Sequence, residues 1–389
     1  MDKLHSHAPV IWKPIIAQRR NLWEAAKMTK VVVLYDTWSK ADAKNIWEES
    51  LKASLGHDYS KHDIIYVENR TGLFKWSTEV RENVKEAFGD PEYIKKSIAG
   101  AELVLSGFAP MTASVMDSNP SLKVIGIARG GPVNVDVGAA TARGVMVVGT
   151  VGRNAESVAD QTLGFILSES RQIARHNHAL KTGAYFTESQ NIGRGKYLDR
   201  YDFQELGGKT LGLIGFGEVG RRVAKRARAF GMTVQVFDPY ITAEALSVED
   251  CRKVELEQLL RTSDFVSIHA KLTPETTHML NSERLAKMKT SAIIVNTARG
   301  EIIDEKALYE ALKSKKIASA ALDVFEEDPV KPGNPLLTLE NVTATPHTAG
   351  RSPEVERRGY QQVADATAKY LRGEAIKRSQ IANPKVLER

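Results

Sequence analysis

LGLIGFGEVGRRVAKRARAFGMTVQVFD, residues 211–238, is the stretch that decides the fold. It opens with a short apolar run, typical of a buried strand, that leads directly into Gly215-x-Gly217-x-x-Gly220. Apolar residues then recur on one face of a predicted helix: Val219, Val223, Ala227 and Phe230. A second strand, TVQVFD, ends at Asp238. This order of strand, glycine turn, helix and acid-terminated strand predicts a dinucleotide-binding βαβ unit.

Each glycine of the turn has a separate physical purpose. Gly215 permits the tight turn, Gly217 lets the backbone approach a pyrophosphate, and Gly220 lets the helix pack closely on the strand. The helix N-terminus offers N–H groups and a partial positive charge to the phosphates. The Asp238 carboxylate is expected to bind the ribose hydroxyls, and no arginine follows it directly, so NAD is favoured over NADP. The alternative is a glycine-rich turn that binds nothing.

Short apolar runs alternate with helical patterns on both sides of this unit. A first series of predicted strands covers residues 30–36, 63–67, 102–106, 122–128 and 145–148. A second series covers residues 210–214, 233–237, 265–269, 292–296, 318–322 and 342–344. Apolar runs without alternation fit parallel sheets covered on both faces, and two series indicate two α/β domains. A single (β/α)₈ barrel would also fit the length, but the glycine turn argues against it. A last helix is predicted from Ser352 to about Leu371.

The composition excludes several classes of protein. The 54 Lys and Arg are interspersed with 48 Asp and Glu, and the basic cluster at 221–226 is short, so nucleic-acid binding is not expected. A single cysteine, Cys251, and no Cys/His ligand pattern predict no disulfide and no metal site. No apolar run reaches the roughly 18 residues of a membrane span. We therefore expect a cytoplasmic protein of enzyme size.

Polar residues follow three successive strands of the second series. Arg299 follows the strand that ends at Asn296, Asp323 follows the next strand, and His347 follows the last. Ligands of open α/β sheets bind at the carboxyl ends of the strands. An arginine clamps a carboxylate, and a histidine transfers protons near neutral pH, as reduction of a 2-keto acid requires. Each residue alone has an ordinary alternative: a loop arginine, a solvated acidic turn or a structural histidine.

Several ordered motifs make the chain resemble the D-isomer-specific 2-hydroxyacid dehydrogenase family, which includes phosphoglycerate dehydrogenases. The resemblance covers roughly residues 122–350, through LKVIGIA, NVDVGAATARGV, SVADQTLGFIL, GKTLGLIGFGEVG, NTARGEIIDEKAL, ALDVFEEDP and TPHTAG. It implies that Arg299 binds the substrate carboxylate, that His347 is the acid/base and that Asp328 supports His347. Further contacts with NAD are implied for Val219, Ala270, Thr297, Asp323 and Gly350, in addition to the glycine turn, Asp238, Arg299 and His347.

The resemblance also implies a split architecture. A Rossmann NAD-binding domain, residues 134–350, is expected to be inserted into a flavodoxin-like substrate domain formed by residues 30–133 and 351–389. Residues 1–29 are expected to form an N-terminal arm. The implied partner is a small 2-hydroxy or 2-keto acid, and the implied assembly is a homodimer. Residues 183–204 are longer than is usual in the family and are a further candidate for subunit contacts.

Two departures from the family affect the site. Asp328 stands where the family normally has a glutamate, so the shorter carboxylate has one methylene less with which to reach His347. Arg129 stands in the substrate loop where relatives have a small residue, followed by Gly130 and Gly131. We hypothesise that Arg129 binds a second anionic group while the glycine amides face a carboxylate. The alternative is that Arg129 pairs with a local carboxylate.

The sequence thus favours an NAD-dependent D-2-hydroxyacid dehydrogenase or 2-ketoacid reductase. An NAD(H)-sensing binding protein, similar to the transcriptional corepressors of the family, is the alternative because those proteins keep the same three residues. A Rossmann protein of unrelated chemistry would make the three strand-end motifs coincidental.

Overall fold

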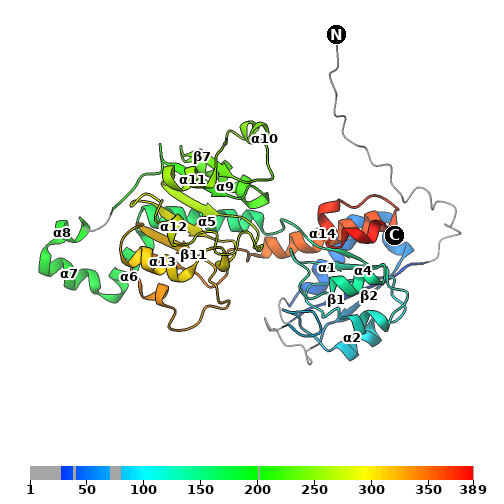
Figure 1. Ribbon diagram of the computed structural model, residues 1–389. Helices are drawn as coiled ribbons and strands as arrows, with labels where there is room; N and C mark the ends of the chain where they lie inside the picture. The colour runs from blue at the N-terminus through cyan, green and yellow to red at the C-terminus, as the bar shows by residue number, and fades with distance from the viewer. Residues whose placement is uncertain (1–27, 38–40, 71–79, 200–201, 389) are drawn as a thin grey trace, which may run out of the picture. The chain divides into compact units, whose positions relative to one another are not determined.

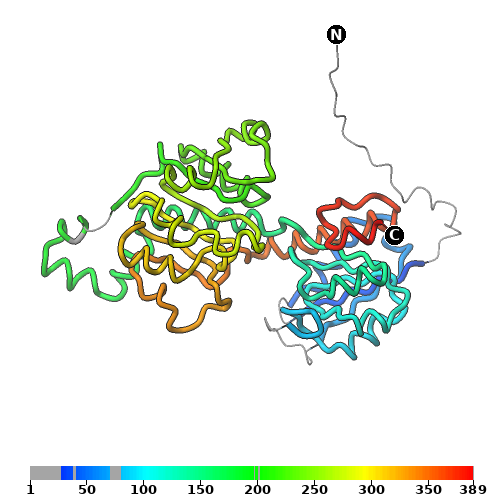
Figure 2. The backbone as a smooth tube through the Cα atoms, viewed as in Figure 1, coloured from blue at the N-terminus to red at the C-terminus, as the bar shows by residue number. Residues whose placement is uncertain are grey.

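The computed structural model describes residues 28–37, 41–70, 80–199 and 202–388, which form two compact units (Figure 1). The first unit comprises residues 1–153 and 353–389, and the second comprises residues 154–352. Figure 2 traces the chain from the first unit into the second and back again for its last helix. The expectation of two α/β domains, one of them inserted into the other, matches this path.

The first unit contains a parallel five-stranded sheet in the order β2-β1-β3-β4-β5. Its strands are β1 (Lys30–Tyr35), β2 (Asp63–Glu68), β3 (Leu103–Ser106), β4 (Val124–Ile127) and β5 (Met146–Val148). Its helices are α1 (Ala43–Leu55), α2 (Pro91–Ser97), α3 (Ala113–Asp117), α4 (Val137–Ala142) and α14 (Pro353–Leu371). This strand order is the flavodoxin-like one.

Both faces of the first sheet are covered. Helices α1 and α14 pack on one face, where Trp47 and Tyr360 are in ring contact with centroids 4.6 Å apart. Helices α2, α3 and α4 pack on the other face. The central strand β1 is therefore apolar along its length, with Val31 to Leu34 all fully buried. The predicted helix after Ser352 is confirmed as α14, and it belongs to the first unit.

The second unit contains a parallel seven-stranded sheet in the order β12-β11-β10-β9-β6-β7-β8. Its strands are β6 (Thr210–Ile214), β7 (Thr233–Phe237), β8 (Arg252–Lys253), β9 (Phe265–Ile268), β10 (Ile293–Asn296), β11 (Ser319–Leu322) and β12 (Val342–Ala344). Its helices are α5 (Ala155–Ser170), α6 (Ile173–Thr182), α7 (Ala184–Ile192), α8 (Arg194–Leu198), α9 (Glu218–Ala229), α10 (Ala243–Val248), α11 (Leu256–Thr262), α12 (Ser282–Leu285) and α13 (Glu305–Lys313). With β6 first, the order is that of a Rossmann fold with one added strand. Two open sheets exclude the barrel alternative.

Helices α6, α7 and α8 extend from the second unit as an arm (Figure 1). Helices α5 and α6 are separated at Gln172, whose φ of 58° lies in the left-handed region. No residue of α6 or α7 is buried, and Leu180, Phe186 and Ile192 expose 50%, 53% and 40% of their surface. The arm therefore presents apolar side chains that the described part of the chain does not cover.

One expected domain boundary is wrong by about one strand and one helix. Residues 134–153 were expected in the NAD-binding domain, yet α4 and β5 belong to the first unit. The reason is the sheet register, in which Val124 to Gly126 of β4 pair with Met146 to Val148 of β5. The expected N-terminal arm lies outside the described residues except for Met28 and Thr29.

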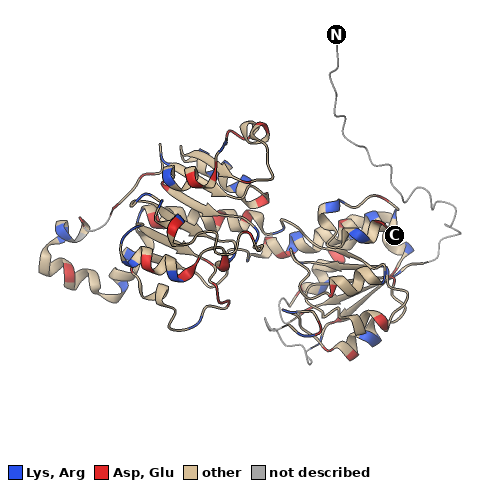
Figure 3. Ribbon diagram, viewed as in Figure 1, with Lys and Arg blue, Asp and Glu red and all other residues tan. Residues whose placement is uncertain are grey.

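The surface charges are mixed in sign over both units (Figure 3). The basic cluster on α9 is largely neutralised by α5, because Arg222 and Arg226 both donate to Glu156 at 2.6 Å. None of the described helices combines the length and the apolar character that crossing a membrane would require.

Candidate active site

The glycine turn between β6 and α9 needs two of its three glycines for close packing. Gly215 has a φ of 93°, and a Cβ at this position would lie 2.7 Å from the backbone nitrogen of Ala270. A Cβ on Gly220 would lie 2.5 Å from the carbonyl oxygen of Gly215, so any larger residue would push the helix off the turn. A Cβ on Gly217, in contrast, would meet nothing within 4 Å. The backbone at Gly217 is therefore open to a ligand.

The N-terminus of α9 fits an anionic group. Gly217 is the N-cap residue and supplies no capping side chain, so the first amides of the helix have no acceptor within it. Glu218, the first helical residue, carries a negative charge that would oppose a phosphate. Its carboxylate instead accepts a hydrogen bond from Arg222 at 2.7 Å, which offsets that charge. The turn thus has the open backbone and the free N–H groups that a pyrophosphate requires.

Asp238 lies at the end of β7, the strand next to the glycine turn. Its two oxygens accept hydrogen bonds from the backbone N–H groups of Phe216 at 2.8 Å and Tyr240 at 2.9 Å. These bonds hold the carboxylate beside the turn with further lone pairs available. A carboxylate in this position suits the two hydroxyls of a ribose and repels a phosphate on the same sugar.

Arg299 points to solvent from a turn that Asn296 fixes. The Asn296 side chain, 1% exposed, donates to the carbonyl oxygen of Arg299 at 2.8 Å and accepts from the N–H of Ala298 at 3.0 Å. The Arg299 guanidinium donates only to the Ala298 carbonyl, at 2.6 Å, among the residues that the structure describes. Most of its donors are therefore available to a carboxylate.

The loop after β12 is held by Asp323, which is 1% exposed. One oxygen of the Asp323 carboxylate accepts from the Thr345 hydroxyl at 2.5 Å and from the Thr348 N–H at 2.8 Å, and the other accepts from the Ala349 N–H at 2.9 Å. The backbone N–H of His347 also donates to the Asp323 carbonyl, at 2.8 Å. Asp323 was predicted to contact the cofactor, and sequence reasoning missed that it shapes the histidine loop.

His347 and Asp328 form a hydrogen-bonded pair at the carboxyl edge of the sheet. The His347 Nδ1 and Asp328 Oδ2 atoms are 2.5 Å apart, so the shorter carboxylate does reach the imidazole. An ionised carboxylate accepts from Nδ1–H, which leaves Nε2 as the free ring nitrogen. Both side chains are about half exposed, at 43% and 48%. The backbone of His347 has a φ of 54°, an uncommon conformation that the Asp323 contacts impose.

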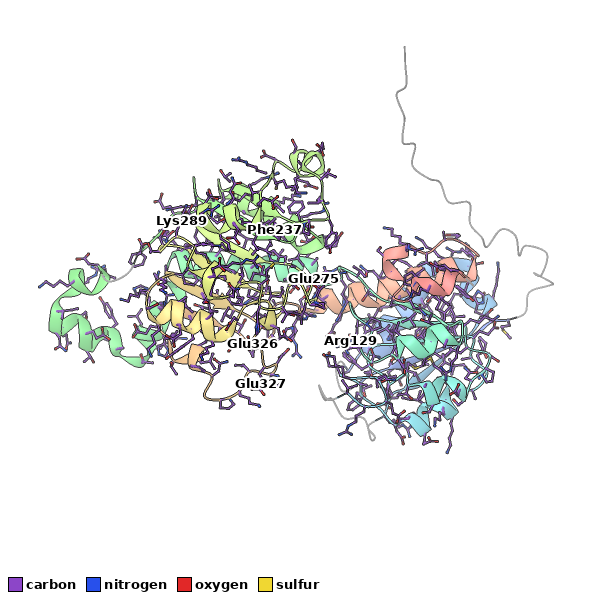
Figure 4. The ribbon with its side chains drawn as sticks, in the orientation of Figure 1. Arg129, Phe237, Glu275, Lys289, Glu326 and Glu327 are labelled. Atoms are coloured by element: carbon purple, nitrogen blue, oxygen red, sulfur yellow. The ribbon has the colours of Figure 1, made fainter. Side chains whose placement is uncertain are left out.

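The loops after β9, β10 and β11 are tied to one another. A Cβ on Gly300 would lie 1.9 Å from the carbonyl carbon of Phe325, so the arginine loop packs directly on the loop that carries Asp328. The His278 Nε2 atom lies 2.9 Å from a carboxylate oxygen of Glu326, and Glu326 also accepts from the backbone N–H of Glu305. Figure 4 shows Glu326 and Glu327 in the loop after β11. No local sequence pattern predicts this support, because its partners come from three different loops.

The other predicted contacts with the cofactor occupy the same edge of the second sheet. The Thr297 hydroxyl hydrogen-bonds to the Thr162 hydroxyl at 3.0 Å, and Gly350 lies against the Asn154 side chain. Val219 and Ala270 are partly buried against the two cores of the unit. These residues and the glycine turn all belong to the second unit.

His269, at the end of β9, has a perturbed pKa. Burial lowers the pKa of the imidazole to about 3, so His269 is neutral at ordinary pH. Its Nε2 hydrogen-bonds to the Ser267 hydroxyl at 3.0 Å. His269 precedes Ala270, whose backbone contacts Gly215, so this neutral side chain belongs to the support of the glycine turn.

Arg129 lies in the first unit (Figure 4). The structure pairs it with a local carboxylate. Its guanidinium donates to the backbone carbonyl of Glu86 at 2.9 Å and forms an ion pair with the Glu86 carboxylate. It also lies over the Phe108 ring, 5.1 Å from the centroid. Arg129 therefore pairs with a local carboxylate, as the alternative interpretation of the sequence expected. Its contact with a substrate stays a prediction. A Cβ on the neighbouring Gly130 would meet only the Thr150 carbonyl oxygen, at 3.9 Å, and a Cβ on Gly131 would meet nothing within 4 Å.

Metal ligands do not cluster in the described ranges, where no group of three or more His, Cys, Asp or Glu side chains could hold an ion. Cys251 is buried, and burial raises the pKa of its thiol to about 11, so the thiol stays protonated.

A Rossmann sheet with this glycine turn and this acid is typical of a dinucleotide-binding protein, and an arginine and a histidine lie at the same carboxyl edge. Residues 163–349 match the family described as D-isomer specific 2-hydroxyacid dehydrogenase, NAD binding domain. The chain is 44% identical over 258 residues to hydroxypyruvate reductase of Thermotoga maritima, covering 66% of this chain and 80% of that protein. The chain belongs to the D-isomer specific 2-hydroxyacid dehydrogenase family, a family of NAD-dependent oxidoreductases.

Two further similarities support this assignment. The chain is 43% identical over 313 residues to D-3-phosphoglycerate dehydrogenase of Methanocaldococcus jannaschii, covering 79% of this chain but only 54% of that protein. It thus spans about half the length of that relative. Among solved structures, apo D-mandelate dehydrogenase of Rhodotorula graminis superposes with a TM-score of 0.74 at 25% identity, covering 92% of this chain and 98% of that one. The family resemblance and the α/β fold class drawn from the sequence are confirmed.

Proposed function

We propose that this protein transfers a hydride between a nicotinamide cofactor and C2 of a 2-hydroxy or 2-keto acid. The observation that carries the proposal is the His347–Asp328 pair, 2.5 Å apart, on the same sheet edge as Arg299 and the glycine turn. The relatives named above are dehydrogenases and reductases, which favours an enzyme over the sensing alternative.

The chain's own residues supply binding and proton transfer. When bound, the cofactor supplies the hydride, and the amides around Gly217 and the Asp238 carboxylate would hold its pyrophosphate and ribose. The free donors of Arg299 bind the substrate carboxylate and polarise the C2 carbonyl. The His347 Nε2–H gives its proton to the C2 oxygen during reduction and takes it back during oxidation. Asp328 stabilises the charged imidazole at Nδ1 and fixes its orientation.

We propose NAD as the cofactor in preference to NADP. The Asp238 carboxylate is anchored by two backbone N–H groups, so it cannot swing away from the ribose without losing both. A 2′-phosphate would be placed against this charge with no compensating arginine directly after it in the sequence. The contacts predicted for Val219, Ala270, Thr297, Asp323 and Gly350 belong to the same proposal.

Residues of the first unit are proposed to set substrate preference. Gly130 and Gly131 offer backbone N–H groups, and Arg129 adds positive charge beside them although its guanidinium also bonds to Glu86. The names of the relatives differ in the acid used, since one acts on phosphoglycerate and another on hydroxypyruvate. The substrate is therefore proposed only as a small 2-hydroxy or 2-keto acid.

We further propose a homodimer that uses the arm α6–α8. A single chain leaves Leu180, Phe186 and Ile192 about half exposed on an arm of three short helices. A second copy would bury these apolar side chains on both subunits at once, as a two-fold interface does. Analytical ultracentrifugation of Phe186→Glu tests the proposal: the substitution should yield monomers, whereas an unchanged dimer would place the interface elsewhere.

The function is tested by NADH oxidation, followed at 340 nm, with a panel of 2-keto acids. The panel contains glyoxylate, hydroxypyruvate, branched, aromatic and sugar-derived keto acids, and phosphorylated ones. Turnover of at least one acid, lost in Arg299→Gln, is the expected result. Tight NADH binding without turnover of any acid would contradict the proposal and favour the sensing alternative.

A further inference from the structure

Asp328 lies on an exposed loop between two buried anchors. Phe325 before the loop and Leu336 after it belong to one hydrophobic core, with 5% and 0% of their surface exposed. The residues of the loop, 326–334, are exposed or half-exposed, and among them Val330 packs partly against this core. Apolar packing therefore holds the ends of this segment more firmly than the backbone of Asp328.

An aspartate makes the position of this backbone more critical than a glutamate would. The Asp328 Oδ2 and His347 Nδ1 atoms are 2.5 Å apart, and a hydrogen bond is lost beyond about 3.5 Å. The aspartate side chain has one rotatable bond fewer than glutamate, so it cannot recover the contact if the loop moves by more than about 1 Å. The pair with His347 therefore needs a loop that other contacts hold in place.

Glu305, the first residue of α13, contacts both ends of this loop. One oxygen of its carboxylate accepts from the backbone N–H of Glu326 at 2.9 Å, and the other accepts from the side-chain amide of Asn334. The backbone N–H of Glu305 in turn donates to the Glu326 carboxylate at 3.0 Å. A single side chain thus clamps the loop on both sides of Asp328.

Helix α13 gives Glu305 a fixed position. The Asp304 side chain caps the helix, because it accepts from the backbone N–H of Ala307 at 2.9 Å. Leu308 and Leu312 of the same helix are each 1% exposed, and Glu305 itself is half-buried. A capped helix with a buried apolar face is rigid, so its first residue can hold a loop that lacks such packing.

Two carboxylates lie close together in this clamp, and donors around them offset their repulsion. The His278 Nε2 atom lies 2.9 Å from an oxygen of the Glu326 carboxylate. An ionised carboxylate only accepts, so Nε2 of His278 carries a proton in this contact. The Asn334 amide and the two backbone N–H groups supply the other donors. The contact between Glu305 and Glu326 therefore depends on directed hydrogen bonds, which a side chain without acceptors cannot replace.

We propose that Glu305 is a positioning residue for proton transfer, which clamps the loop 326–334 so that Asp328 stays in contact with His347. Glu305 touches neither the substrate nor the reacting atoms in this proposal and acts through Asp328. The inference rests on the proposed function, in which His347 transfers the proton and Asp328 stabilises the charged imidazole.

The test is a double-mutant cycle between Glu305 and Asp328. NADH oxidation with the best acid of the panel gives kcat and KM for the wild type, Glu305→Ala, Asp328→Asn and the double variant. Glu305→Gln keeps one acceptor oxygen in nearly the same shape. Glu310→Ala, which changes an exposed glutamate of the same helix, is the matched control. Circular dichroism checks that each variant folds, and fluorescence titration gives the Kd for NADH.

Glu305→Ala should lower kcat by roughly tenfold in the wild-type background but by less than about twofold in the Asp328→Asn background, where the clamp has no carboxylate left to position. The Kd for NADH should change by less than about twofold. Glu305→Gln should keep part of the lost kcat, and the control should match the wild type. Equal losses in the two backgrounds, or no loss in the wild-type background, would overturn the positioning role.

If the wild type reduces no acid, the proposed function fails, and amide hydrogen exchange decides the clamp alone. Peptides that cover residues 326–334 should exchange at least about tenfold faster in Glu305→Ala than in the wild type and in Glu310→Ala. Unchanged exchange of these peptides would overturn the clamp.

Discussion

Replacing Asp323 with alanine should destabilise the second unit and loosen the loop that carries His347. The carboxylate is 1% exposed and accepts three hydrogen bonds of 2.5–2.9 Å from Thr345, Thr348 and Ala349. Removing it leaves two backbone N–H groups without an acceptor, at about 1–3 kcal/mol each. Water entering the vacated space would offset part of this cost. The expected loss is about 2–4 kcal/mol of the free energy of unfolding.

The assay must report on the second unit, and the chain has no tryptophan between residues 154 and 352. Urea unfolding followed by far-ultraviolet circular dichroism gives the stability, and amide hydrogen exchange of the peptide 343–352 gives the local effect. Asp160→Ala is the matched control, since this carboxylate is 66% exposed and pairs with Arg226 at the surface. Asp160→Ala should lower the free energy of unfolding by less than about 1 kcal/mol. Equal stabilities of the two variants, or unchanged exchange in the peptide, would refute the assigned role of Asp323.

Three further outcomes follow from the geometry. Gly220→Ala should raise the Kd for NADH at least about tenfold, because the new methyl group would lie 2.5 Å from the Gly215 carbonyl oxygen. Fluorescence titration with NADH measures this Kd, and unchanged binding would contradict the packing argument. Because burial lowers the pKa of His269 to about 3, from 6.5, the unfolded chain binds the proton more readily between these values. The contribution of His269 to the free energy of unfolding should be present in full above pH 6.5, and this free energy should fall by about 1–2 kcal/mol towards pH 5. In urea titrations at each pH, His269→Asn should flatten this profile. Asp238→Ser should raise kcat/KM with NADPH relative to NADH by about tenfold or more, and an unchanged ratio would show that Asp238 does not select the cofactor.

Most of the fold could be predicted because its determinants are local. Buried parallel strands are apolar without alternation, so their positions follow from short windows, as at Ile293–Asn296. The turn at Gly215 is encoded by the glycines themselves. The two-residue edge strand Arg252–Lys253 was missed because it has no apolar run. The boundary at 134 was misplaced because β5 joins the first sheet through register, which no local pattern specifies.

The residues of the candidate site also differ in whether their determinants are local in the sequence. Residues at strand ends, such as Arg299 and His347, could be located because the carboxyl ends of parallel strands share one edge. The contacts that decide what these residues do depend on distant partners. Arg129 and Glu86 are 43 residues apart in the sequence, and Asp323 meets Ala349 across 26 residues. That the Arg153 guanidinium has no acceptor in the described part of the chain could not be predicted from the sequence, because it depends on the hydrogen-bond partners of its spatial neighbours.

The proton-transfer role of His347 is the central claim, and His347→Asn tests it most directly. Asparagine tolerates the left-handed backbone that His347 adopts at a φ of 54°, so the loop should keep its shape while the acid/base group is lost. With the best acid of the panel, kcat should fall by about 10²–10⁴ while the Kd for NADH changes less than twofold. Turnover close to that of the wild type would contradict the claim, and so would a loss of NADH binding in proportion to the loss of turnover.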